Sequence, residues 1–173
     1  MTFAFPLLDQ IKTVLIDAAP GMPPDIWWVT ACVLFILALA ALVDAFTTTV
    51  PDAFIFLGLF SITLMQGLFA SWEIAAQHLQ YAIAAGLFIF AVNFLWVKKF
   101  HYDAIGMGDA KWTMLAVACF GIESAVLAWG IGSVLATIFI GLFRLFKYQI
   151  TKVTFSPFLF IGLGVGLYAT RFW

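Results

Sequence analysis

The sequence predicts an all-α fold: a polytopic bundle of six transmembrane helices preceded by an N-terminal interfacial amphipathic helix. Of its 173 residues, 65% are hydrophobic and only 10% are charged, and the mean hydropathy is +1.10. A soluble domain carries about 25% charged residues, so lipid must cover much of this surface. In addition, apolar runs of about the length of one membrane crossing alternate with short polar segments.

Residues 1–25 differ from the rest and predict the interfacial helix. Apolar residues recur there at helical spacing, and polar residues occupy the opposite face. Such a helix lies on the membrane surface instead of crossing it. Three prolines, Pro20, Pro23 and Pro24, then separate it from the first span. We therefore divide the chain into an N-terminal segment, 1–25, and one transmembrane domain, 26–170.

Six apolar segments follow, each bounded by polar residues or glycine. The longest internal polar stretch opens with Lys98 and ends at Asp109. The run after it is longer than one span requires, and Gly121 is the natural place to divide it. Residues 71–78 are expected to form a short loop. The expected spans are 26–43, 52–70, 79–97, 110–120, 124–143 and 155–170.

Basic residues set the expected orientation. With six spans, six of the eight Lys and Arg residues lie on one side of the membrane. Because cytoplasmic loops carry an excess of Lys and Arg, both termini should lie outside the cytoplasm. The basic residues are scattered along the chain, so nucleic acid is not an expected partner. The six are Lys98, Lys99, Lys111, Arg144, Lys147 and Lys152.

Asp44 ends the first span, and its position is unusual for a boundary residue. A negative charge at the C-terminal end of a helix opposes the helix dipole, and a basic residue would be favourable there. The following loop, residues 45–51, contains three threonines and no cation to pair with Asp44. Asp44 is either a carboxylate at the water boundary or a functional group, and this feature favours the second.

Asp109 follows two glycines, Gly106 and Gly108, at the start of the fourth span. Alone, it suits a helix N-cap as well as a functional site. The glycines leave the backbone uncovered and permit positive φ, so an extended peptide can lie close. We therefore expect Gly106 and Gly108 to bind substrate. Lys111 is a further candidate for substrate binding, although a basic residue here also suits a topology anchor.

Asp44 and Asp109 are expected at the same cytoplasmic edge although they are far apart in sequence. Ionisable groups at membrane depth are costly and usually functional. Two carboxylates that share a proton can activate water and protonate a leaving amine, which is aspartic-peptidase chemistry. The alternative is a non-enzymatic membrane protein, such as a proton-coupled transporter or an assembly subunit. Relay carboxylates usually lie near mid-membrane, so the edge position favours the peptidase.

These motifs resemble those of type IV prepilin peptidases, which are GxGD intramembrane aspartic peptidases. Asp44 followed by Pro51 resembles their first-aspartate motif, and residues 106–111, Gly-Met-Gly-Asp-Ala-Lys, resemble the second. Residues 152–158 resemble the start of the family's last span. The chain departs from the pattern at Asp52, where Asn is usual, and it lacks the insert with paired CxxC zinc ligands of larger members.

The resemblance implies Asp44 and Asp109 as the catalytic pair, with no metal and no organic cofactor. It also implies the substrate: a pilin-like precursor whose short leader is cut at the cytoplasmic edge of the bacterial inner membrane. The precursor's apolar helix would stay in the bilayer. The chain looks like the short peptidases of tight-adherence (Flp-type) pilus systems, and without the insert no N-methyltransferase activity is expected. The pattern indicates no particular oligomeric state.

Overall fold

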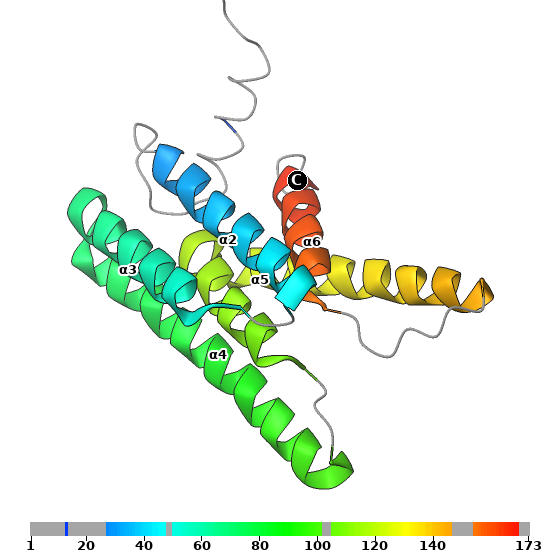
Figure 1. Cartoon of the computed structure of the whole chain (residues 1–173). Coiled ribbons are helices and arrows are strands. Elements are labelled where there is room, and N and C mark those ends of the chain that lie inside the picture. Colours follow the sequence, from blue (N-terminus) through cyan, green and yellow to red (C-terminus); the bar gives the residue numbers. More distant parts are fainter. Residues whose placement is uncertain (1–12, 14–26, 48–49, 102–104, 147–153, 170–173) are drawn as a thin grey trace, which may run out of the picture.

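The computed structural model describes residues 13, 27–47, 50–101, 105–146 and 154–169, and every regular element among them is an α-helix. Apart from residue 13, the segment 1–25, where an amphipathic helix is expected, lies outside the described residues. The helices, labelled in Figure 1, are α2 (Trp27–Thr47), α3 (Asp52–Phe69), α4 (Trp72–Phe100), α5 (Met107–Leu145) and α6 (Ser156–Ala169).

Among the described residues, α2, α3, α4 and α5 are long and apolar enough to cross a membrane. The fifth helix, α6, is apolar but has only 14 residues. Large apolar side chains such as Phe56, Phe60 and Phe88 point outward from the bundle, as expected for a lipid-facing surface. The all-α membrane bundle is therefore confirmed, with four candidate spans by length. The fourth and fifth expected spans both lie within α5, and α6 lies within the sixth.

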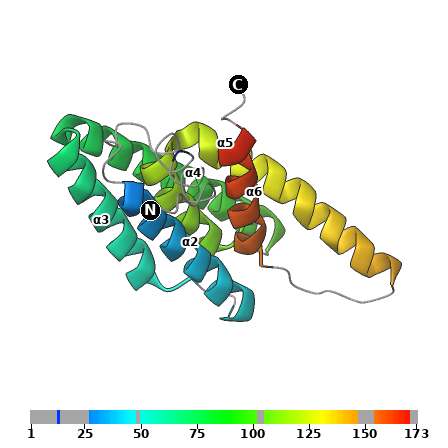
Figure 2. The same cartoon turned by 90° about the horizontal axis from the view of Figure 1, so that it is seen from above.

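A break at Gly121 divides α5, as the sequence predicts. This residue has φ 81° and ψ 169°, a conformation that glycine adopts readily because it has no Cβ atom. The first part of α5 covers 107–120 and the second part covers 122–145. Figures 1 and 2 show the second part extending away from α3 and α4. The 39 residues of α5 thus form two differently directed helices.

The prediction of a loop at residues 71–78 is wrong, because Ser71 caps α4 and residues 72–78 form its first turns. Ser71 caps the helix, and its Oγ accepts a hydrogen bond of 3.1 Å from the backbone N–H of Ile74. Glu73 in the first turn adds a favourable interaction with the helix dipole. At the other end, Lys98 and Lys99 lie in the last turn of α4 and not in a loop. Capping and the dipole therefore extend the helix past the apolar run.

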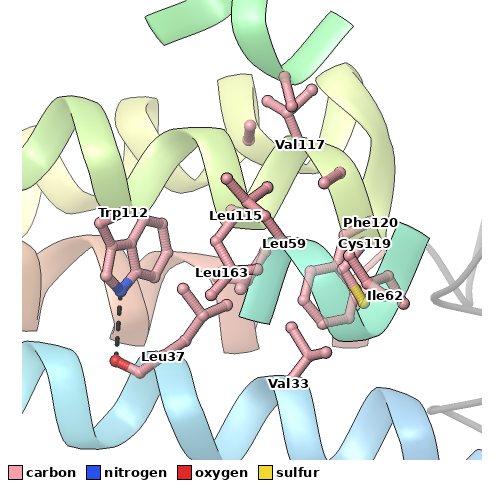
Figure 3. Close-up of a cluster of buried hydrophobic side chains, with 14 of the residues drawn as sticks. Val33, Leu37, Leu59, Ile62, Trp112, Leu115, Val117, Cys119, Phe120 and Leu163 are labelled. Atoms are coloured by element: carbon pink, nitrogen blue, oxygen red, sulfur yellow. Dashed lines mark hydrogen bonds between the residues drawn. The ribbon is translucent and has the colours of Figure 1, made fainter. Parts of the chain in front are cut away.

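The first part of α5 lies at the centre of the bundle, and α5 contacts α2, α3, α4 and α6. Trp112 is fully buried, and its Nε1–H donates to the backbone carbonyl of Leu37 in α2 at 3.3 Å (Figure 3). Ile62 from α3 and Leu163 from α6 are also fully buried in this cluster. The cluster fixes the position of the first turn of α5 relative to its neighbours.

Glycine residues bring α6 close to the second part of α5. A Cβ atom on Gly162 would lie 2.5 Å from the carbonyl oxygen of Ala128, so no side chain fits there. A Cβ atom on Gly132 would lie 3.0 Å from the carbonyl oxygen of Phe158. Small residues permit such close backbone approach between membrane helices. This packing helps to hold the N-terminus of α6 beside the start of α5.

Candidate functional site

The C-terminal end of α2 and the N-terminal ends of α3, α5 and α6 meet at one end of the bundle. Lys111 of α5 forms an ion pair with Asp52, the first residue of α3. Ser156, the first residue of α6, donates a hydrogen bond of 2.8 Å from its Oγ to Oδ1 of Asp109. Asp44 lies in the last turn of α2 and faces Gly108. The structure therefore gathers the predicted site residues at one level of the bundle.

Asp44 is buried, with 6% of its surface exposed. Its Oδ1 lies 3.4 Å from the position that a Cβ atom on Gly108 would occupy. The carboxylate therefore packs against the first turn of α5, within the last turn of α2. The sequence suggests that the first span ends at Asp44, but α2 continues past this residue to Thr47.

Asp109 is equally buried and is the third residue of α5. The N-cap is Gly106, so Asp109 is not the N-cap residue that the sequence also allowed. Its backbone N–H donates to the carbonyl of Gly106 at 3.0 Å. Its Oδ2 folds back to 3.1 Å from the position of a Cβ atom on Gly106. One carboxylate oxygen thus faces Ser156 and the other faces the glycine turn.

The two carboxyl groups face the same glycine turn. Asp44 packs against Gly108 and Asp109 packs against Gly106, so the two carboxylates belong to one site around the glycine turn. Both groups are buried away from bulk water. In such a buried site, a pair of like charges is costly unless the two groups share a proton. This arrangement suits acid–base chemistry on a bound water molecule.

The reason for the glycines differs from the one that the sequence suggests. Gly106 has φ −67° and ψ 143°, and Gly121 is the described glycine with positive φ, so Gly106 and Gly108 do not need left-handed geometry. What matters is space. A Cβ atom on Gly108 would lie 2.9 Å from Cγ2 of Val50. The glycines therefore make room for Val50 and the two carboxylates.

Lys111 has a partner within the chain. Its ion pair with Asp52 joins the starts of α3 and α5, and the Asp52 side chain is 63% exposed. The acidic residue that departs from the family pattern is therefore the partner of the candidate substrate-binding lysine. This contact offers a role for Lys111 in positioning the two helices, beside the substrate contact predicted from its place in the motif.

Two contacts at Asp109 were not predicted from the sequence. Ser156 is fully buried against its carboxylate. Thr113 donates from Oγ1 to the carbonyl oxygen of Asp109 at 2.7 Å and accepts from Nε1 of Trp129 at 2.9 Å. Thr113 lies one turn after Asp109 and is readable as a local helix contact. The position of Ser156 depends on how α6 packs, and no local pattern indicates it.

Comparison with known families supports the motif reading. The model of a family described as the type IV leader peptidase family matches residues 31–144. The match spans most of the chain, includes Asp44 and Asp109, and ends before α6. It confirms the resemblance predicted from the two aspartate motifs. No curated protein and no solved structure gave a significant match.

Proposed function

We propose a function from one premise: the chain belongs to the type IV leader peptidase family. The proposed activity is that of an intramembrane aspartic endopeptidase, with Asp44 and Asp109 as its catalytic pair. The observation that carries this proposal is the burial of both carboxylates around one glycine turn, at one end of a membrane bundle. A proton relay across the membrane is less well supported, because both groups lie at that end.

The proposed chemistry needs a single proton shared between the two carboxyl groups. The ionised carboxylate removes a proton from water, and the resulting hydroxide adds to the carbonyl carbon of the scissile peptide bond. The protonated carboxyl supplies a proton to the carbonyl oxygen. Collapse of the tetrahedral intermediate breaks the C–N bond, and the departing amine takes a proton from the pair. One hydroxyl of the intermediate returns a proton to the pair as the new carboxyl group forms, so the pair again holds a single proton. The hydroxyl of Ser156 would keep Asp109 in one orientation throughout.

The proposed substrate is a pilin-like precursor of the Flp type, and the proposed location is the bacterial inner membrane. In this view, the leader is cut at the cytoplasmic edge, and the chain crosses the bilayer six times with both termini outside the cytoplasm. Two observations support six crossings. The break at Gly121 divides α5, and the contact between Ser156 and Asp109 puts the starts of α5 and α6 at the same end. Reporter fusions after His101 should then read cytoplasmic, and an external signal there would contradict this orientation.

The activity is tested by co-expression with an epitope-tagged pilin precursor. Asp44→Asn and Asp109→Asn should each abolish the leader-length mobility shift, while both variants still accumulate in the membrane. Each change removes one ionisable group and keeps the shape of the side chain. Asp52→Asn is the matched control, because Asp52 is an exposed carboxylate at the same end of the bundle. Near-normal processing by either of the first two variants would exclude the catalytic pair.

A further inference from the structure

An apolar groove of about 500 Å³ lies between α4 and α5. Its walls come from one face of α4, from both parts of α5 and from Ile105. Because the second part of α5 diverges from α4 after Gly121, the two helices leave this space between them. The glycine break therefore helps to form the groove.

One end of the groove reaches the aspartate site. Ile105 directly precedes Gly106, and Thr113, which is bonded to the carbonyl of Asp109, also lines the groove. From there, the lining follows α4 from Val92 back to Tyr81, which is about 17 Å at 1.5 Å per residue. A rod-shaped occupant would therefore have one end at the aspartates and its body along α4.

The lining favours a helix over a lipid chain. Ala84 and Ala85 of α4 and Ala125 of α5 are small residues in the groove, and Phe88 and Trp129 flank them. Lipid tails pack against any apolar surface, whereas small residues are characteristic of places where one membrane helix approaches another closely. Aromatic neighbours give such a helix large contact surfaces.

We propose that this α4–α5 groove binds the apolar helix of the leader-bearing precursor, with the N-terminal end of that helix at Asp44 and Asp109. The inference rests on the proposed function. An apolar helix gains little from leaving lipid, so its binding depends on close packing in the groove. Docking the helix fixes which peptide bond reaches the carboxylates, because that bond lies at a set distance from the docked segment.

The first test is site-specific photocrosslinking in the inactive Asp109→Asn variant, co-expressed with the precursor. A photoreactive amino acid in place of Phe88, an exposed residue of the groove, should crosslink to the apolar helix of the precursor. The same amino acid in place of Leu87, which is also exposed but does not line the groove, should give at most a tenth of that product. Equal yields at both positions, adducts with lipid alone, or adducts with a second copy of this chain would overturn the proposal.

The second test separates the groove from the chemistry. Ala84→Phe places a ring in the groove at an exposed position, and Ala76→Phe places one at an exposed position of α4 outside it. Ala84→Phe should lower kcat/KM for the membrane-bound precursor about 10-fold, and Ala76→Phe should change it less than 2-fold. An unchanged Ala84→Phe enzyme would overturn the groove and leave the peptidase intact. If wild type cleaves no precursor, the proposed function fails, and the crosslink at residue 88 still decides whether the groove binds a helix.

Discussion

Replacing Ser156 with alanine removes one hydroxyl group from the Asp109 site and leaves the carbon skeleton of the side chain in place. Ser156 is fully buried, and its Oγ–H donates to Oδ1 of Asp109 at 2.8 Å. A hydrogen bond to a charged group contributes about 1.5–3 kcal/mol. If the hydroxyl holds the carboxylate in its productive orientation, its loss lowers kcat by about 10- to 100-fold. The value of KM should change little, because Ser156 faces the carboxylate and not the groove.

The assay is cleavage of a purified precursor in lipid nanodiscs, with kcat and KM measured separately. Ser124→Ala is the matched control, since Ser124 is a buried serine of α5 beyond the Gly121 break. That control should retain kcat within 2-fold, and both variants should accumulate like wild type. A Ser156→Ala enzyme with unchanged kcat, or one that loses activity only because it fails to accumulate, would refute the assigned role in positioning Asp109.

Three further predictions concern packing around the site. Gly162→Ala should lower both the thermal unfolding temperature and the cleavage rate, because its Cβ would meet a backbone carbonyl of α5 at 2.5 Å; Gly164→Ala, with nothing within 4 Å, should do neither, and equal effects would contradict this reading. Gly108→Ala should cut kcat at least 10-fold with normal accumulation, because the new methyl group would crowd Val50 at 2.9 Å, directly beside the Asp44 carboxylate; normal kinetics would show that the turn can adjust. Lys111→Met and Asp52→Asn should each cost less than about 1 kcal/mol in urea unfolding and change cleavage by less than about 3-fold, since Asp52 is exposed and Lys111 only half-buried. Loss of cleavage in the lysine variant alone would instead favour a direct substrate contact.

Local signals in the sequence were sufficient for the membrane class and the approximate positions of most of the apolar helices. Low charge and long apolar runs require lipid contact, whatever the arrangement of the helices. Gly121 was readable as a break because glycine tolerates a conformation that other residues avoid. Asp44 and Asp109 stood out because carboxylates at membrane depth are energetically costly and therefore usually have a function. Each of these inferences depends on properties of one segment at a time.

Helix ends were harder to predict because hydropathy reports where lipid begins and not where a helix stops. The polar residues after Ser71 suggested a loop, yet the serine cap and Glu73 begin α4 there. Gly106 and Gly108 permit positive φ, but neither of them adopts it. Their lack of side chains serves the packing of Val50 and the two carboxylates, which come from other parts of the chain.

The tertiary structure alone decided which faces of the helices meet. These helices are apolar on nearly all sides, because lipid and the protein interior both favour apolar residues, so the sequence carries little information about which face is buried. The bond from Ser156 to Asp109, the ion pair between Lys111 and Asp52, and the α4–α5 groove all depend on that choice. The sequence determined which groups are the candidates for the chemistry, since charge inside a membrane is rare. Packing determined which neighbours hold those groups, because close approach between helices depends on the shapes of surfaces that are distant in sequence.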